Sequence, residues 1–201
     1  VEYVIHAGRP YTVCTTEWTV DDPRIDSLFR SASDNSLITP GMRFDGDVLD
    51  MERTRLTDLM RQHGYLYFNR DLLQYVADTS AGDHQVDVVL HVERPLSRGK
   101  RGLKGTPEGT VYTLKDITVD MTDRPLSGGS APLIDSLSYE GYEFLYGGEQ
   151  PKYRPKALSS SLLLKPDARY SQTSNDRTYR RLTNLRVFDR VDIAYDTLNT
   201  R

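Results

Sequence analysis

The amino-acid sequence has little of several features that mark common protein classes. It contains one cysteine, Cys14, which excludes an intramolecular disulfide and a zinc site built on paired cysteines. No run approaches the ~18 consecutive apolar residues that a membrane-spanning helix needs, and the first residues are not those of a secretion signal. With 26 basic and 29 acidic residues the formal net charge is -3, which argues against a general nucleic-acid binder because phosphate contacts need a basic surplus.

Aromatic side chains, by contrast, are plentiful. The 201 residues include 13 tyrosines and 5 phenylalanines, too many for a disordered chain. Hydrophobic residues make up only 37%, which is low for a single compact domain of this length. Because small domains bury a smaller share of their surface, these figures fit two small domains as well as one of ordinary size.

An internal repeat favours two domains. When the chain is shifted by 126 positions, residues 40–59 fall on residues 166–185 without a gap and with seven identities. The identical pairs are Pro40/Pro166, Arg43/Arg169, Asp50/Asp176, Arg55/Arg181, Leu56/Leu182, Thr57/Thr183 and Leu59/Leu185. At a shift of 85, residues 5–10 (IHAGRP) fall on residues 90–95 (LHVERP). A turn followed by a helix, repeated in this way, is typical of a duplicated unit.

These matches predict how the chain is divided. Residues 1–10 are expected to be the closing strand of a preceding unit, and residues 11–95 a complete unit. A stretch rich in glycine and basic residues over 96–109 is expected to be a linker. Residues 110–201 are then a second unit, with a long insertion over 122–155 and without a final strand.

Residues 11–20 form the first predicted strand of the complete unit, because they are rich in β-branched and aromatic residues. A period-2 pattern puts Cys14 on the same face as Trp18, so the thiol is expected to be a small buried hydrophobe rather than a nucleophile. Asp22 and Pro23 are expected to start a helix, as its N-cap and its first-turn residue.

A second helix is expected between Asp47, as its cap, and Gly64, which ends it. This helix is followed by a predicted strand over 65–79 that is interrupted near Asn69. In the last predicted strand every second side chain is expected to point into the core. Those inward residues are Val86, Val88, Leu90 and Val92. The unit therefore has the predicted order β-α-α-β-β.

The second unit is predicted to repeat these elements around a long interruption. Its expected elements are a strand within 111–121, a short helix over 157–164, a helix over 176–187 and a strand over 190–195. The interruption contains Tyr139, Tyr142, Phe144 and Tyr146, interleaved with glycines. Such a segment is either a contact surface or folds back onto its own domain, and the sequence leaves both open.

No set of side chains has the spacing of a catalytic or metal site. The four histidines, His6, His63, His84 and His91, lack the close pairing of metal ligands along the chain. Asp22 and Asp47 are explained as helix caps rather than as a catalytic carboxylate pair. We therefore expect a protein that is not an enzyme and that holds neither a cofactor nor a metal.

The predicted linker carries a basic cluster without an acidic neighbour. Its residues are Arg98, Lys100, Arg101 and Lys104. Gly99 to Gly102 resembles the GxxG loop of nucleic-acid-binding KH domains, but that loop joins two helices and here it follows the last strand. The cluster is either part of a solvated linker or a contact for anionic lipid headgroups or an acidic partner.

Several motifs together resemble one family of modules. Residues 40–45 (PGMRFD) are followed by residues 64–68 (GYLYF) and 75–79 (YVADT), and the second unit has residues 177–182 (RTYRRL) and 191–193 (VDI). This combination resembles the POTRA modules of the BamA/TamA outer-membrane assembly factor family, and it is most similar to Bacteroidota members such as the TamL/BamA-like proteins. The motifs are structural rather than catalytic.

The resemblance implies an α+β fold of tandem POTRA modules, each with two helices on a three-stranded mixed sheet, and leaves open whether the last module is complete. It implies a place on the periplasmic side of the outer membrane of a Gram-negative bacterium, with an outer-membrane barrel outside these residues. The expected partners are unfolded outer-membrane proteins, periplasmic chaperones and lipoprotein or inner-membrane partners, and no nucleic acid. Clients would be guided by adding a strand to an open sheet edge.

Strand addition needs exposed edge strands, and the sequence predicts two. Their client-binding residues are expected to be Leu72, Gln74 and Val76 in the first unit and Val191, Ile193 and Tyr195 in the second. Two alternatives use the same module: a two-partner secretion transporter, and an envelope or cell-division scaffold. A small periplasmic enzyme is the least supported class, because no constellation of side chains favours it.

Overall fold

The computed structural model describes residues 3–4, 8–93, 106–122 and 134–197. The chain divides into two compact units, one of residues 1–61 and 65–110 and one of residues 62–64 and 111–201. Within the expected closing strand over 1–10, the described residues 3–4 and 8–10 have no regular structure. Residues 96–105 of the expected linker lie outside the described residues.

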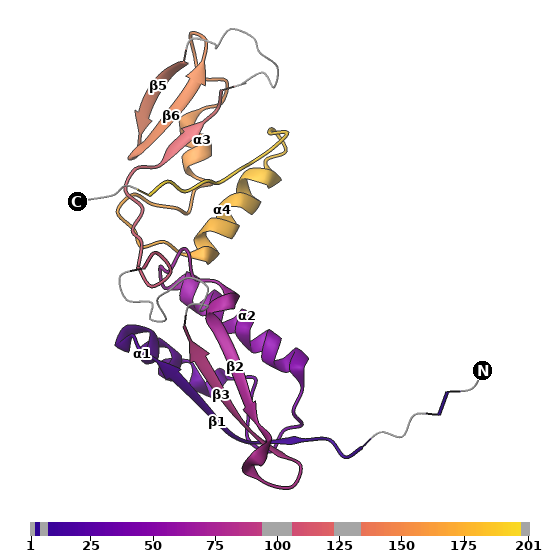
Figure 1. The fold of residues 1–201 in the computed structure, drawn as a ribbon. Helices are drawn as coiled ribbons and strands as arrows, with labels where there is room; N and C mark the ends of the chain where they lie inside the picture. The colour runs from indigo at the N-terminus through magenta and orange to yellow at the C-terminus, as the bar shows by residue number, and fades with distance from the viewer. Residues whose placement is uncertain (1–2, 5–7, 94–105, 123–133, 198–201) are drawn as a thin grey trace. The chain divides into compact units, whose positions relative to one another are not determined.

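In its described residues the first unit has two α-helices and one three-stranded sheet (Figure 1). Its elements are β1 (Thr12–Val20), α1 (Pro23–Ser31), η1 (Ser33–Asn35), α2 (Gly46–Gln62), η2 (Arg70–Leu72), β2 (Leu73–Asp78), η3 (Thr79–Ala81) and β3 (Gln85–Val92). The strand order is β1-β3-β2, with β1 parallel to β3 and β2 antiparallel to β3. This confirms the predicted α+β class with a mixed sheet, and in this unit also the order β-α-α-β-β.

Capping residues decide where the two helices begin. The carboxylate of Asp22 accepts a hydrogen bond from the backbone N–H of Arg24, and Pro23 occupies the first turn, as predicted. The second helix begins one residue before the predicted cap, because Asp45 accepts from the N–H of Asp47 at 2.9 Å. The expectation that Asp47 is the cap was therefore wrong, and Asp45 has that role.

Asp22 yields a test of the first helix. The side-chain hydrogen bond from Arg24 holds the pKa of the Asp22 carboxyl below its ordinary value, so this group stabilises the fold above about pH 3.9 and the stabilisation is lost as the pH falls through the lowered pKa. Asp22→Ala should lower the free energy of unfolding at neutral pH by about 0.5–2 kcal/mol.

Urea unfolding across the acid range checks this, with Asp22→Asn as control, since asparagine keeps the cap but not the charge. The asparagine variant should lose less stability than the alanine variant and should show a flatter acid limb than the wild type. A wild type and an alanine variant of equal stability at pH 7 would contradict the capping role.

Alternation along β3 builds the core of the first unit. Val86, Val88, Leu90 and Val92 are all at most 5% exposed, as the period-2 pattern predicted. They lie on the sheet face covered by the helices, where Ile25 of α1 is fully buried.

Cys14 is exposed, so the expectation of a buried thiol was wrong. The register between β1 and β3 shifts between Val13 and Thr16, and Val13 is the buried residue at this point. A bulge adds a residue to one strand and reverses the side-chain alternation beyond it. The alternation of the sequence alone does not show where such a bulge falls.

The described part of the second unit also has a three-stranded mixed sheet and two α-helices (Figure 1). Its elements are β4 (Thr118–Asp120), β5 (Ile134–Tyr139), β6 (Tyr142–Gly147), α3 (Pro155–Ser159) and α4 (Gln172–Asn184). The strand order is β4-β6-β5, with β4 parallel to β6 and β5 antiparallel to it, the same arrangement as in the first unit. The hairpin here precedes the helices along the chain, whereas β2 and β3 follow them.

The elements of the second unit differ from the predicted ones in extent. The strand expected within 111–121 is reduced to β4 and an isolated bridge between Thr113 and Arg169. The helix expected over 176–187 is present, and it begins at Gln172, which is 126 positions after the first residue of α2. Residues 134–147, expected to be irregular, form the β5–β6 hairpin.

Candidate functional site

The outer edge of β2 is the clearest candidate for binding another chain. β2 pairs only with β3 among the described residues. The N–H of Glu93 donates to the carbonyl of Leu72 at 3.0 Å, and hydrogen-bonded pairs in an antiparallel ladder recur at every second residue. Gln74 and Val76 therefore bond to β3, whereas the backbone groups of Tyr75 and Ala77 point away from the sheet.

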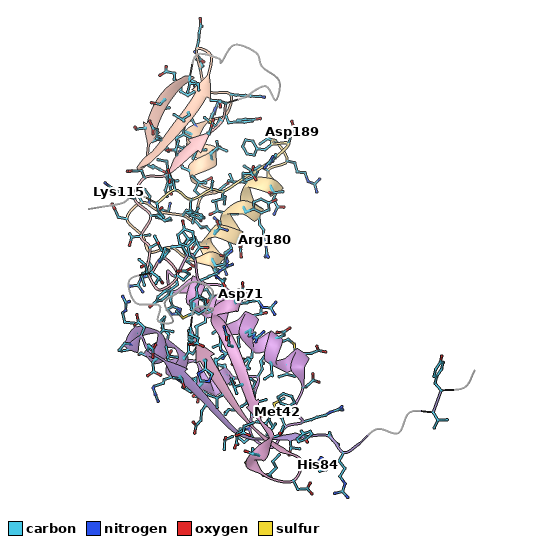
Figure 2. All side chains as sticks on the ribbon, viewed as in Figure 1. Met42, Asp71, His84, Lys115, Arg180 and Asp189 are labelled. Atoms are coloured by element: carbon cyan, nitrogen blue, oxygen red, sulfur yellow. The ribbon has the colours of Figure 1, made fainter. Side chains whose placement is uncertain are left out.

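The other edge of this sheet is partly covered by the chain itself. The N–H of Val13 donates to the carbonyl of Met42 at 2.8 Å, and the N–H of Phe44 donates to the carbonyl of Tyr11 at 2.8 Å. Met42 is labelled in Figure 2, near the beginning of β1. The first residues of β1 thus have backbone partners on their outer side, which β2 lacks within the described part of the chain.

The predicted residues of this site divide into two groups. Gln74 and Val76 lie on β2, opposite His91 and Val89 of β3, and Val76 is 52% exposed. Leu72 lies in η2 and is 1% exposed, so its side chain is core rather than contact surface. The side chain of Asn69 accepts a hydrogen bond from the N–H of Asp71, which starts this turn of 3-10 helix before the strand.

Tyr75 fixes β2 to the second helix. Its ring lies under the guanidinium of Arg53, 5.6 Å from the ring centroid, and burial raises the pKa of its hydroxyl above the ordinary value. Because the side chain of Tyr75 is held on the helix side, its backbone groups are presented at the edge in a fixed orientation. No pattern in the sequence indicates this anchoring role.

A second edge without a partner strand among the described residues lies on β5, and the sequence interpretation missed it. The hairpin turn has Glu140 and Gly141 at φ 52° and 82°, as a two-residue type I′ turn requires. Since Tyr139 and Tyr142 are then a hydrogen-bonded pair, the backbone groups of Ser136 and Ser138 face outward. A Glu-Gly pair between two alternating segments was the available signal.

The tyrosine-rich segment is mainly core. Tyr142, Phe144 and Tyr146 are 1%, 0% and 9% exposed, and Tyr139 packs beside them. The hydroxyl of Tyr142 donates to the carbonyl of Leu164 at 2.9 Å. Of the two alternatives left open, the structure therefore shows folding back onto the same unit rather than a contact surface.

The strand expected over 190–195 is absent, since residues 187–197 have no regular structure. Val191, Ile193 and Tyr195 are half-buried, in the alternation that suggested a strand. The hydroxyl of Tyr195 donates to the side chain of Asn175 at 2.7 Å, and its ring meets that of Tyr170 edge-on. Tyr195 thus packs against α4, and no described strand pairs with residues 190–195 to form a ladder.

Other candidates from the sequence form no cluster. Among the described residues there is no group of three histidine, cysteine or acidic side chains placed to hold a metal. His84, labelled in Figure 2, packs against Tyr11 with the two rings tilted by 55° and their centroids 5.4 Å apart. His6 and the basic cluster of Arg98, Lys100, Arg101 and Lys104 lie outside the described residues. Within the part of the chain that the structure describes, no helix is long and apolar enough to cross a membrane.

Comparison with solved structures identifies similar folds. The chain is similar to the crystal structure of Haemophilus influenzae BamA POTRA3-5, with a TM-score of 0.50 and 11% identity, over 95% of this chain and 57% of that one. It is also similar to the crystal structure of BamA from Haemophilus ducreyi lacking POTRA domains 1-3, with a TM-score of 0.56 and 12% identity, over 94% of this chain and 27% of that one.

The similarity to these two structures is limited to part of their length and to the fold. The chain spans 57% and 27% of the lengths of these two structures, less than two thirds of either. No family model matches the chain, and a search of curated proteins finds no match either. At 11–12% identity the likeness concerns the fold, and the chain therefore has the fold of BamA POTRA domains.

Proposed function

We propose that this chain is a periplasmic protein-binding region of an outer-membrane β-barrel assembly or translocation factor, that it guides unfolded outer-membrane proteins, and that it acts by binding rather than catalysis. The Bacteroidota TamL/BamA-like origin suggested by the sequence motifs is part of this proposal. Docking of periplasmic chaperones, lipoproteins or inner-membrane partners would accompany client binding.

The uncovered outer edge of β2 is the observation that carries the proposal. Backbone N–H and C=O groups of Tyr75 and Ala77 point away from the sheet, and an extended client strand can pair with them. Pairing through backbone groups does not depend on the client's side chains. Such an edge suits clients of many sequences, and the shallow exposed side chain of Val76 adds apolar contact without a demanding pocket.

Proline at position 77 tests strand addition. Ala77→Pro removes an outward-facing N–H but leaves the ladder bonds to β3, which Val76 and Asp78 make. Affinity for peptides taken from outer-membrane β-strands should fall at least about tenfold, because a backbone bond is lost and its partner is left unpaired. Fluorescence anisotropy with labelled peptides measures the effect.

The matched control is Ser138→Pro, which removes an outward-facing N–H from the β5 edge in the same way. It should leave peptide affinity within about twofold of the wild type. Loss only in the Ser138→Pro variant would move the site to β5, and retention of affinity in both variants would overturn strand addition at these edges. Thermal unfolding by circular dichroism verifies that both variants fold.

The range of bound peptides separates this function from the two-partner secretion alternative. An assembly factor should bind strands from several unrelated outer-membrane proteins with affinities of the same order. Binding restricted to one sequence would instead favour a transporter with a dedicated client.

A further inference from the structure

The exposed face of α4 carries an unusual concentration of arginines for a chain with net charge -3. Arg177, Arg180 and Arg181 lie at i, i+3 and i+4 on this helix, and Arg186 follows just after its end. All four are exposed, and Arg180 is labelled in Figure 2. We call these four residues the arginine face.

Comparison with α2 shows what the arginine face lacks. In α2 the guanidinium of Arg55 donates to both oxygens of the buried carboxylate of Glu52, at 2.6 and 2.7 Å. That carboxylate also accepts from the N–H of Leu37 at 3.1 Å. The charge of Arg55 is thus neutralised within the unit.

The repeat places Thr178 where α2 has Glu52 and Arg181 where it has Arg55. Thr178 is 1% exposed, and its hydroxyl accepts from the N–H of Leu163, the counterpart of Leu37, at 2.9 Å. The uncharged hydroxyl of Thr178 therefore accepts the same backbone hydrogen bond that the carboxylate of Glu52 accepts in the first unit. Among the described residues Arg181 has no carboxylate partner, and its guanidinium donates to the carbonyl of Ser160 at 3.5 Å.

The rest of the arginine face is equally without acidic partners. Within the described ranges, no ion pair or hydrogen bond of the side chains of Arg177, Arg180 or Arg186 is found. Asp176, the nearest acidic residue in sequence, accepts from the side chains of Gln172 and Asn175 instead. Several guanidinium groups on one face are therefore free to bind an external anion.

The surroundings extend this positive surface and add apolar groups. Ser160, which Arg181 contacts, lines a surface hollow together with Arg154, Lys156 and the acidic Glu140. Leu185, four residues after Arg181 at the end of α4, and Val187, which follows Arg186, are 41% and 48% exposed. Aromatic and aliphatic side chains beside cations are characteristic of segments that lie on membrane surfaces.

We propose that the arginine face binds the anionic phosphate headgroups of a phospholipid surface. The guanidinium fork matches phosphate oxygens with two parallel hydrogen bonds, and several exposed arginines can engage several headgroups at once. An acidic protein would also offer anionic groups, but it would leave the exposed Leu185 and Val187 without a role. The inference uses the membrane setting of the proposed function but not client binding, so either can fail without the other.

Vesicle co-sedimentation of the full chain tests the proposal. The chain should bind phosphatidylcholine vesicles that contain phosphatidylglycerol but not vesicles of phosphatidylcholine alone, and about 0.5 M salt should abolish binding by screening. Each arginine near an anionic surface contributes about fivefold in affinity. Replacing Arg177, Arg180 and Arg186 by glutamine should therefore weaken binding roughly a hundredfold.

The matched control replaces three exposed arginines of the first unit, Arg30, Arg43 and Arg70, by glutamine, which changes the net charge equally. This variant should bind within about threefold of the wild type. Equal losses in both triple variants, or equal binding to both kinds of vesicle, would overturn the proposal. Binding to polyglutamate but not to vesicles would overturn it in favour of an acidic protein partner.

Discussion

We expect Phe144→Ala to lower the free energy of unfolding of the second unit by about 3–5 kcal/mol, the usual cost of removing a buried phenyl ring. Phe144 is the centre of this core. It lies on the middle strand β6, is 0% exposed, and packs with Tyr142, Leu158 and Leu162. A small unit has few other buried side chains to compensate, so a loss of this size is a large fraction of its stability.

Hydrogen exchange of the amides of β6 measures this effect, because these amides report the opening of the central strand. Leu145→Ala is the matched control on the same strand, since successive side chains point to opposite faces and Leu145 is only half-buried. The control should cost less than about 2 kcal/mol. Equal losses for the two variants would show that the helix-covered face is not the core of this unit.

Glu52→Ala should have a comparable effect on the first unit, lowering its free energy of unfolding by about 3–5 kcal/mol. The Glu52 carboxylate is 3% exposed and accepts from the N–H of Leu37, the hydroxyl of Ser36 and the guanidinium of Arg55. Alanine leaves these donors without an acceptor, and Arg55 becomes a partly buried charge without its partner.

Urea unfolding followed by the fluorescence of Trp18, the only tryptophan, reports on this unit. Asp50→Ala is the control, because Asp50 lies on the same helix and pairs with Arg53 and Arg70 but is 57% exposed. An exposed pair contributes about 0–1 kcal/mol, so the control should change little. An Asp50→Ala variant as unstable as Glu52→Ala would contradict the importance of burial.

The candidate site was partly predictable from sequence. The motif after the second helix indicated an edge strand, and Gln74 and Val76 do lie on β2, at the edge of its sheet. Leu72 was misplaced because a turn of 3-10 helix, started by Asn69, precedes the strand. Which backbone groups point outward depends on the ladder register, which only the pairing of β2 with β3 defines.

The edge strand β5, unlike β2, was not predicted from the sequence. Its turn residues, Glu140 and Gly141, were visible in the sequence, but the segment was interpreted as an insertion because the repeat predicts no strand there. The repeat likewise predicted a strand over 190–195. Alternation is a local property, whereas a strand exists only where another backbone supplies hydrogen-bond partners.

The sequence by itself determined the α+β class, the caps and periodicity that form the helices, and the 126-residue spacing at which α2 and α4 begin. These depend on contacts between residues close along the chain. Tertiary structure alone decided that Cys14 is exposed, that the tyrosine-rich segment is core, and that Arg181 has no carboxylate partner within the described ranges. Each of these depends on which segments distant in sequence lie side by side, because a bulge, a strand pairing or a buried acceptor is a property of two segments and not of one.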